Sequence, residues 1–186
     1  MLTLFKKQWQ NSDESDKLLI AIHNLLEPIT KNIKILLIGT GHSDEQYEDW
    51  PMVFENLGAS SIEYIEAYEP NVTKFKDKKY KVTHLEAQNL RHGSFDIIGW
   101  FHGPEHVSKE DCVAILNNCK NIATKLVITL CPYGGYYDST QDSINPYERH
   151  AQQDMGPEAI IDSGYETFIV GPRGGPNSAI LGYFKK

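Results

Sequence analysis

Residues 35–41 read ILLIGTG, an apolar run that ends in two glycines with a threonine between them. The run completes a longer apolar segment, Ile33–Ile38, of the kind that forms a strand buried on both faces of a parallel sheet. A glycine after such a strand lets the backbone pass close to a ligand. An ordinary tight turn can have the same sequence, so Gly39, Thr40 and Gly41 are candidate binding residues at this point.

The rest of the chain alternates short apolar segments with helical ones, which is the pattern of a parallel sheet with crossover helices. The predicted strands cover residues 33–38, 62–66, 80–85, 95–101 and 126–130, and the predicted helices begin near residues 13, 51, 70, 108 and 157. A hairpin at 165–170 and 179–184 ends the chain. We therefore expect one α/β domain over 1–186, with a helical N-terminal segment over 1–30. Ligands bind such sheets beyond the carboxyl ends of the strands, at the switch point between the first and fourth strands.

The composition is that of an ordinary globular protein, with 186 residues, 40% hydrophobic, 23% charged, and a formal net charge of −7. No apolar run approaches the ~18–20 residues that span a bilayer, and the first ten residues lack a secretory signal. We therefore expect a cytoplasmic protein with no membrane partner. Cys112, Cys119 and Cys131 form no CxxC pair, as in a reducing compartment, and we expect buried thiols. The basic residues are scattered apart from one short lysine cluster at 74–81. Nucleic-acid-binding proteins usually carry a dominant basic face, so a nucleic-acid partner is disfavoured.

Acidic residues lie at the end of the second predicted strand and directly after the third. Glu66 lies twenty-five residues after Gly41 and can accept hydrogen bonds from ribose hydroxyls, the role of an acid ~20 residues beyond a glycine loop. Glu69 competes for this role, although it can also cap the next helix, and a surface acid is the alternative for Glu66. After the third strand, Glu86 could accept from an adenine amine, and the Ala87 amide could donate to a ring nitrogen.

The fourth predicted strand runs into two histidines separated by Gly103-Pro104. His102 and His106 could act as a base, as a metal pair or as structural hydrogen-bonding groups. Two histidines at this spacing align as ligands on a helix, and the Gly-Pro pair breaks one. We therefore predict no metal site. The polar stretch at 42–49 also contains metal-binding residue types, but a solvated loop explains it.

The connection from Cys131 to Gly156 is long for a compact domain, and loops of this length are usually functional. We expect it to form a mobile substrate lid over 131–156, with His150 pointing into the site. It contains four tyrosines that could wall a planar substrate, unless they only pack against the domain: Tyr133, Tyr136, Tyr137 and Tyr147.

Taken in order, these motifs resemble those of the class I S-adenosylmethionine (SAM)-dependent methyltransferases, over about residues 33–186. The most specific stretches are FDIIGWFHGPEHVSKED at 95–111 and NPYERH at 145–150, the latter followed by GYET. The resemblance implies a Rossmann-like three-layer sandwich, whose seven-stranded, mostly parallel sheet has the order 3-2-1-4-5-7-6 and an antiparallel seventh strand.

The same resemblance implies the place of each part of the cofactor SAM. Gly39, Thr40 and Gly41 would approach its methionine portion, and Glu66 would hold its ribose. Glu86 and Ala87 would hold the adenine, and Phe101 and His102 would border the methyl group. The sequence departs from the family at Leu37, where an acid is usual, in lacking a third glycine, and in a first crossover helix that we expect to begin late, at Pro51.

The function that we expect is methyl transfer from SAM to a small-molecule nucleophile, with an aromatic acceptor as one candidate. The protein mainly has to position the nucleophile in line with the methyl group, and a base is needed only where the nucleophile loses a proton. His102 and His150 are the candidate bases. Because Leu37 replaces the usual acid, a SAM-binding but catalytically degenerate interaction module is the alternative. An NAD-dependent oxidoreductase ranks lowest, because no third glycine follows Gly41 before Gly58.

Overall fold

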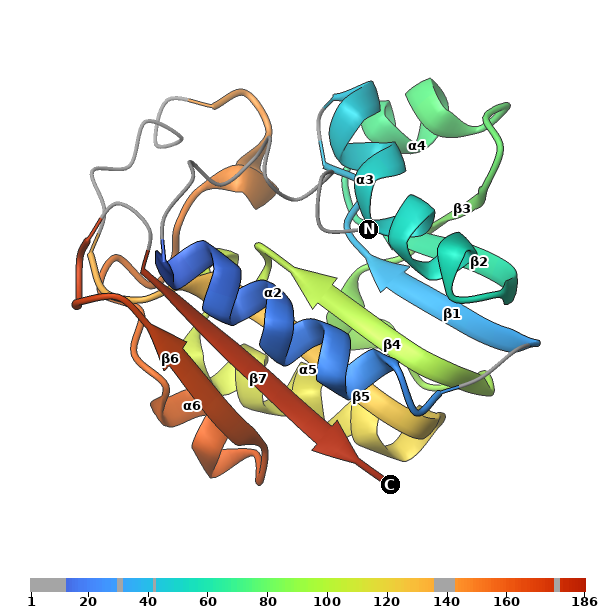
Figure 1. Ribbon diagram of the computed structural model, residues 1–186. Helices are drawn as coiled ribbons and strands as arrows, with labels where there is room; N and C mark the ends of the chain where they lie inside the picture. Colours follow the sequence, from blue (N-terminus) through green and yellow to red (C-terminus); the bar gives the residue numbers. More distant parts are fainter. Residues whose placement is uncertain (1–12, 30–31, 42, 136–142, 176–177) are drawn as a thin grey trace.

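The computed structural model describes residues 13–29, 32–41, 43–135, 143–175 and 178–186. Its elements, in chain order, are α2 (Asp13–Leu26), β1 (Ile33–Ile38), α3 (Asp44–Asn56), β2 (Ala59–Glu66), α4 (Glu69–Phe75), β3 (Lys81–His84), η1 (Ala87–Asn89), β4 (Phe95–Phe101), η2 (Pro104–His106), α5 (Lys109–Ile122), β5 (Ala123–Pro132), η3 (Pro146–Glu148), α6 (Glu158–Asp162), β6 (Glu166–Val170) and β7 (Ala179–Lys185). Figure 1 shows a twisted sheet with helices on both of its faces.

The strands form one seven-stranded sheet in the order β3-β2-β1-β4-β5-β7-β6. The strands β3, β2, β1, β4 and β5 pair in parallel, and β7 runs antiparallel to both β5 and β6. The predicted order and the antiparallel seventh strand are therefore confirmed. Because β1 lies between β2 and β4, the crossover direction reverses there, and the sheet has its switch point at the end of the ILLIGTG run.

Two apolar cores, one on each face of the sheet, make the fold a three-layer sandwich. Leucine and isoleucine side chains of α2, with aromatic residues of α3 and α4, pack on one face. The apolar sides of α5 and α6 pack on the other. The strand β1 contributes to both cores, with Ile35 and Leu37 on one side and Leu36 and Ile38 on the other. This two-sided burial explains why nearly all of its residues are apolar.

The helix α3 corrects one expectation from the sequence. It begins at Asp44, so most of the predicted polar loop is helical, and Pro51 lies inside the helix rather than at its start. The reason is Tyr47, whose buried ring stacks on that of Phe75 with centroids 4.4 Å apart. Its hydroxyl also donates to the Tyr80 carbonyl at 2.9 Å. These contacts fix the first turns, although a proline follows and removes one helical N–H.

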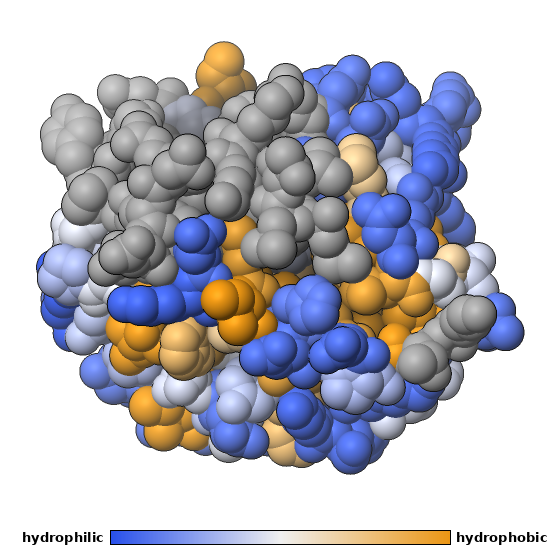
Figure 2. Space-filling model, viewed as in Figure 1, coloured by the Kyte–Doolittle hydropathy of each residue, from blue (hydrophilic) through white to orange (hydrophobic). Residues whose placement is uncertain are grey.

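The lysine cluster lies at the α4 end of the sheet and is matched by acids. Lys74 and Lys78 pair with Asp44, Lys79 pairs with Glu55, and Lys81 pairs with Glu63. Figure 2 shows mainly hydrophilic side chains over this part of the visible face. The cluster is therefore a mixed surface of both charges rather than a basic face.

All three cysteines are buried, as predicted. Burial raises the pKa of the Cys112 and Cys119 thiols to about 12, and burial likewise raises the pKa of Cys131. In the part of the chain that the structure describes, no helix combines the length and the apolar character needed to cross a membrane.

Candidate functional site

A cavity of about 810 Å³ opens at the carboxyl ends of β1, β2, β4 and β5. Its volume is in the range of small-molecule and cofactor sites. The lining comes from the segment after β1, the end of β2, the turn after β4 and the segment after β5. The cavity therefore lies at the switch point of the sheet, where the sequence predicts a ligand.

The glycine loop after β1 forms one edge of this cavity. Gly39 and Gly41 have φ values of +84° and +68°, a region that favours glycine. A Cβ added at Gly39 would meet no atom within 4 Å, so its conformation, and not crowding, accounts for the glycine. The Gly39 N–H donates to the Ile65 carbonyl at 2.9 Å, which ties the loop to the end of β2.

Glu66 lies beside this loop and is only 6% exposed, so the alternative that it is a surface acid is wrong. Its Oε2 accepts from the Thr40 N–H at 2.9 Å and from the Thr40 hydroxyl at 2.6 Å, and its Oε1 accepts from the Tyr68 N–H at 2.8 Å. A carboxylate has about four acceptor positions, so roughly one remains, on Oε1. Glu69 is exposed at the start of α4 and does not line the cavity.

The structure separates Glu86 from Ala87. Ala87 lines the cavity, but Glu86 does not, and its Oε1 accepts from the Tyr147 hydroxyl at 2.9 Å. This hydrogen bond raises the pKa of Tyr147 above its usual value. Tyr147 itself lines the cavity, so Glu86 helps to hold an aromatic ring over the site.

Two stacked aromatic rings form another wall. Phe101, at the end of β4, stacks face to face on Trp50 of α3, with centroids 3.5 Å apart and planes within 6°. Both rings line the cavity. Sequence reasoning selected Phe101 but missed Trp50, because we expected residues 42–49 to be a loop and the helix to begin only at Pro51. A tryptophan directly before that proline was the available signal.

His102 follows β4 in a left-handed conformation, with φ of +52°, which is uncommon for a residue other than glycine. Its N–H donates to the Leu130 carbonyl at 2.7 Å, and its Nδ1 lies 3.5 Å from Glu105 Oε1. Desolvation lowers the pKa of His102, but the hydrogen bond and charge of Glu105 outweigh it, so the net pKa is raised. Half of the side chain remains exposed, which limits the effect of desolvation.

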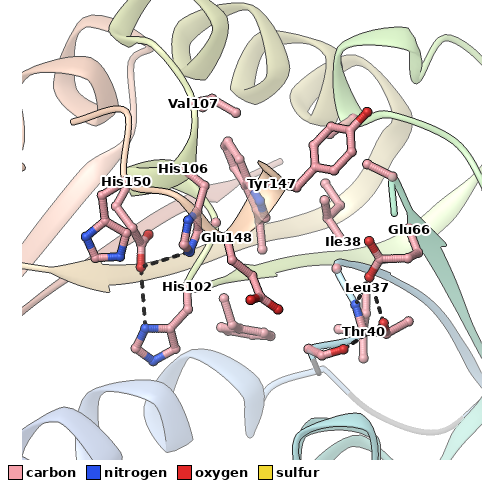
Figure 3. A pocket seen from close by; sticks show the side chains of 18 of the residues that line it. Leu37, Ile38, Thr40, Glu66, His102, His106, Val107, Tyr147, Glu148 and His150 are labelled. Carbon is pink, nitrogen blue, oxygen red and sulfur yellow. Dashed lines mark hydrogen bonds and ion pairs between the residues drawn. The ribbon is translucent and has the colours of Figure 1, made fainter. Parts of the chain in front are cut away.

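Glu105 is 1% exposed and lies among three histidines of the cavity wall. Its Oε1 is 4.0 Å from His106 Nε2, and the rings of His106 and His150 meet edge to face with centroids 4.8 Å apart. Figure 3 shows His102, His106 and His150 converging at one end of the cavity, away from Glu66 and Thr40. Within the described residues, neither Glu105 Oε2 nor His106 Nδ1 has a hydrogen-bond partner.

The described part of the segment from Cys131 to Gly156 is tied to the turn after β4. The side chain of Gln152 donates to the carbonyls of Pro104 and Val107, at 2.9 and 3.0 Å. The Gln152 N–H donates to the Glu105 carbonyl at 3.0 Å. These bonds bring His150 into the cavity lining. Tyr133 also lines the cavity, whereas Tyr136 and Tyr137 lie outside the described residues.

No protein-family model matches the chain, and no curated protein matches it in sequence. Comparison with solved structures finds the N-methyltransferase NodS of Bradyrhizobium japonicum in complex with S-adenosylhomocysteine (TM-score 0.62, 9% identity, 95% of this chain and 89% of that one). It also finds an S-adenosylmethionine-dependent methyltransferase of Clostridium acetobutylicum (TM-score 0.58, 11% identity, 94% and 92% covered). A Rhodobacter sphaeroides structure described as a candidate zinc-dependent alcohol dehydrogenase is similar as well (TM-score 0.59, 12% identity, 88% of each chain).

At such identities the likeness concerns the fold, and chemistry has to be argued from the site. The strand order, the antiparallel seventh strand and the cavity at the switch point agree with the fold that the sequence motifs indicate. The chain therefore has the Rossmann-like fold of the class I SAM-dependent methyltransferases.

Proposed function

We propose that this protein transfers a methyl group from SAM to a small-molecule nucleophile. The observation that carries the proposal is the cavity at the switch point, which brings the Gly39–Gly41 loop and the buried Glu66 together beside Phe101 and His102. A cofactor that spans this cavity would meet a glycine loop, a carboxylate and an aromatic wall in the order that the motifs predict.

The chain offers a partner for each part of the cofactor. The Gly39–Gly41 loop would hold the methionine portion. Ser43 lines the cavity directly before α3, so the amino terminus of this helix would lie near the carboxylate of SAM. Glu66 would accept from a ribose hydroxyl through the position that remains on Oε1. Ala87 would contact the adenine, and Glu86, outside the lining, accepts from the Tyr147 hydroxyl.

Bound SAM supplies an electrophilic methyl group on a sulfonium, so the residues have to position and deprotonate the acceptor. The rings of Trp50, Phe101, Tyr133 and Tyr147 would enclose a planar acceptor and exclude water. His102 and His150 are the bases that this proposal assigns, since both line the cavity. Glu105 lies within 3.5 Å of His102 Nδ1 and would orient that ring and stabilise its protonated form.

One observation supports a second function, a SAM-binding module that does not catalyse transfer. Leu37 lines the cavity and is 2% exposed, so an apolar side chain stands where the family usually has an acid. Glu148 also lines the cavity, and Figure 3 shows its carboxylate in the space between the histidines and Thr40. In an active enzyme, Glu148 would bind the ammonium group of SAM in place of the usual acid.

Isothermal titration calorimetry with SAM, S-adenosylhomocysteine and NAD tests the proposal. We expect micromolar binding of SAM and its demethylated product, and no heat with NAD. Binding of NAD alone would instead favour an oxidoreductase, and the absence of heat with millimolar SAM and product would overturn both methyl-transfer functions. Conversion of SAM to product with a panel of phenols and amines then separates the enzyme from the module.

A further inference from the structure

Three potential metal ligands meet at the histidine end of the cavity. Glu105, His106 and His150 each offer one ligand atom, and these atoms lie within 4.8 Å of one another. Two of the residues come from η2, and the third follows η3, more than forty positions later in the chain. All three line the cavity, so an ion held between them would face the site.

A second observation concerns the electrostatics of Glu105. Its side chain is 2% exposed, and among the described residues its Oε2 has no hydrogen-bond partner. Burial of a carboxylate is costly unless the charge is paired and its oxygens are bonded. The Nδ1 of His106 is buried without a partner as well. A cation between these groups would compensate the buried charge directly.

We propose that Glu105, His106 and His150 bind a divalent transition-metal ion. Two imidazoles and one carboxylate suit Zn²⁺, Co²⁺, Mn²⁺ or Fe²⁺, whereas Mg²⁺ and Ca²⁺ prefer sets of oxygen ligands. Bond lengths of about 2.0–2.1 Å place tetrahedral donors about 3.3 Å apart, so the side chains would close by roughly 1 Å or more around the ion. This proposal departs from the prediction of no metal, which weighed His102 with His106 and the polar stretch at 42–49, but not Glu105 or His150 as ligands.

Three protein ligands leave a coordination position open, as in catalytic zinc sites. That position would face the cavity. His102, whose Nδ1 lies 3.5 Å from Glu105 Oε1, also lines the cavity there. If the proposed function holds, the ion would take an oxygen or nitrogen atom of the methyl acceptor there and lower its pKa. His150 would then serve as a ligand, which leaves His102 as the base. The acceptor would then be a group that coordinates such ions, such as a phenol, an enol or an imidazole.

Metal titration of tag-free protein, first freed of metal with a chelator, tests the site. We expect one Zn²⁺ per chain by calorimetry, visible d–d absorption when Co²⁺ replaces it, and a higher melting temperature with either ion. Loss of a supporting partner costs metal sites about 10–100-fold in affinity, so Glu105→Gln, His106→Ala and His150→Ala should each cost at least that much. His23→Ala, which removes an exposed histidine of α2, should change nothing.

Two results would overturn the proposal. The first is that wild type binds Zn²⁺ no more tightly than His106→Ala does. The second is that His23→Ala weakens Zn²⁺ binding as much as the site variants do. Circular dichroism of the metal-free variants checks that they fold. If a variant at a buried position does not fold, His150→Ala, at a partly exposed position, still tests the site. Calorimetry with S-adenosylhomocysteine on the same samples keeps the proposals separate, because a lost metal site with intact product binding refutes only the metal.

Discussion

Glu66 and Glu105 are two buried carboxylates on the wall of the same cavity, and their surroundings differ. Glu66 accepts three hydrogen bonds, two from Thr40 and one from Tyr68. Glu105 lies 3.5 and 4.0 Å from two histidines, and its Oε2 has no partner in the described part of the chain. Burial alone therefore does not define the role of an acid. A carboxylate with nearly complete bonding holds a loop in place, and one with incomplete bonding is suited to a further ligand.

The largest expected effect on cofactor binding comes from substitution of Glu66. Glu66→Ala removes the acceptor that we propose for the ribose and leaves the Thr40 N–H without its partner. A hydrogen bond to a charged group contributes about 1.5–3 kcal/mol, so S-adenosylhomocysteine should bind roughly tenfold more weakly or worse. Calorimetry measures this change, with Glu69→Ala as the matched control. If Glu69→Ala weakens binding more, the ribose assignment is wrong.

A pair of isosteric variants sharpens the comparison. In metal-free protein at pH 8, Glu66→Gln should lower the free energy of unfolding by about 1–3 kcal/mol, because an amide NH₂ would face backbone and hydroxyl donors. Glu105→Gln should leave it unchanged or raise it by about 1 kcal/mol, because it removes a buried charge with an unbonded oxygen. Urea denaturation measures both values. Equal losses would show that Glu105 is as well stabilised as Glu66.

The smallest expected effect concerns a third carboxylate, Asp96, near the amino end of the central strand β4, away from the cavity. The Lys34 N–H donates to it at 2.9 Å and Thr124 at 3.0 Å, and Lys125 pairs with it at 3.3 Å. The Lys34 hydrogen bond, with help from Thr124 and Lys125 and against burial, holds the pKa of Asp96 below its ordinary value of 3.8. Such a group stabilises the fold above the unfolded pKa and loses this effect as the pH falls through the folded one.

Asp96→Asn should therefore be slightly less stable than wild type near neutral pH, and the difference should shrink as the pH falls below 3.8. Urea denaturation along a pH series measures it, with the exposed Asp77→Asn as control. A difference that grows at low pH would mean that the Asp96 charge does not stabilise the fold.

The parts of the fold that the sequence predicts best are those where one physical requirement dominates. The strands β1 and β4 have the predicted bounds, because their burial on both faces demands nearly continuous apolar residues, and the polar exceptions Lys34 and Asp96 stand near the strand starts. Ser108 caps α5 as predicted, and its side chain accepts from the Asp111 N–H. The start of α3 was not predicted, because Tyr47 fixes its first turns through contacts with distant residues, and a proline normally marks a helix start.

The candidate site likewise contains residues that the sequence predicted and residues that it did not. Glu66 and the glycine loop were accessible to sequence reasoning, because Glu66 ends a recognisable strand and the loop directly follows one. The Glu105 cluster was not, because its third member comes from a separate segment that Gln152 ties to the turn after β4. The expectation that Gly103-Pro104 breaks a helix overlooked the short 3₁₀ turn η2, which begins at Pro104 and places Glu105 and His106 on the cavity wall. The placement of SAM, the bases and the lid stays a prediction until a ligand complex is measured.

The buried cysteines have a practical consequence for labelling experiments. Thiol reagents attack the exposed thiolate, and the raised pKa of Cys112 and Cys119, together with the burial of all three thiols, suppresses that species in the native protein. A single new cysteine at an exposed position could therefore carry a spectroscopic probe without removal of the native ones. Cys112 and Cys119 lie on the buried side of α5, so they would react when α5 separates from the sheet, and their rate of alkylation would report how often this layer opens.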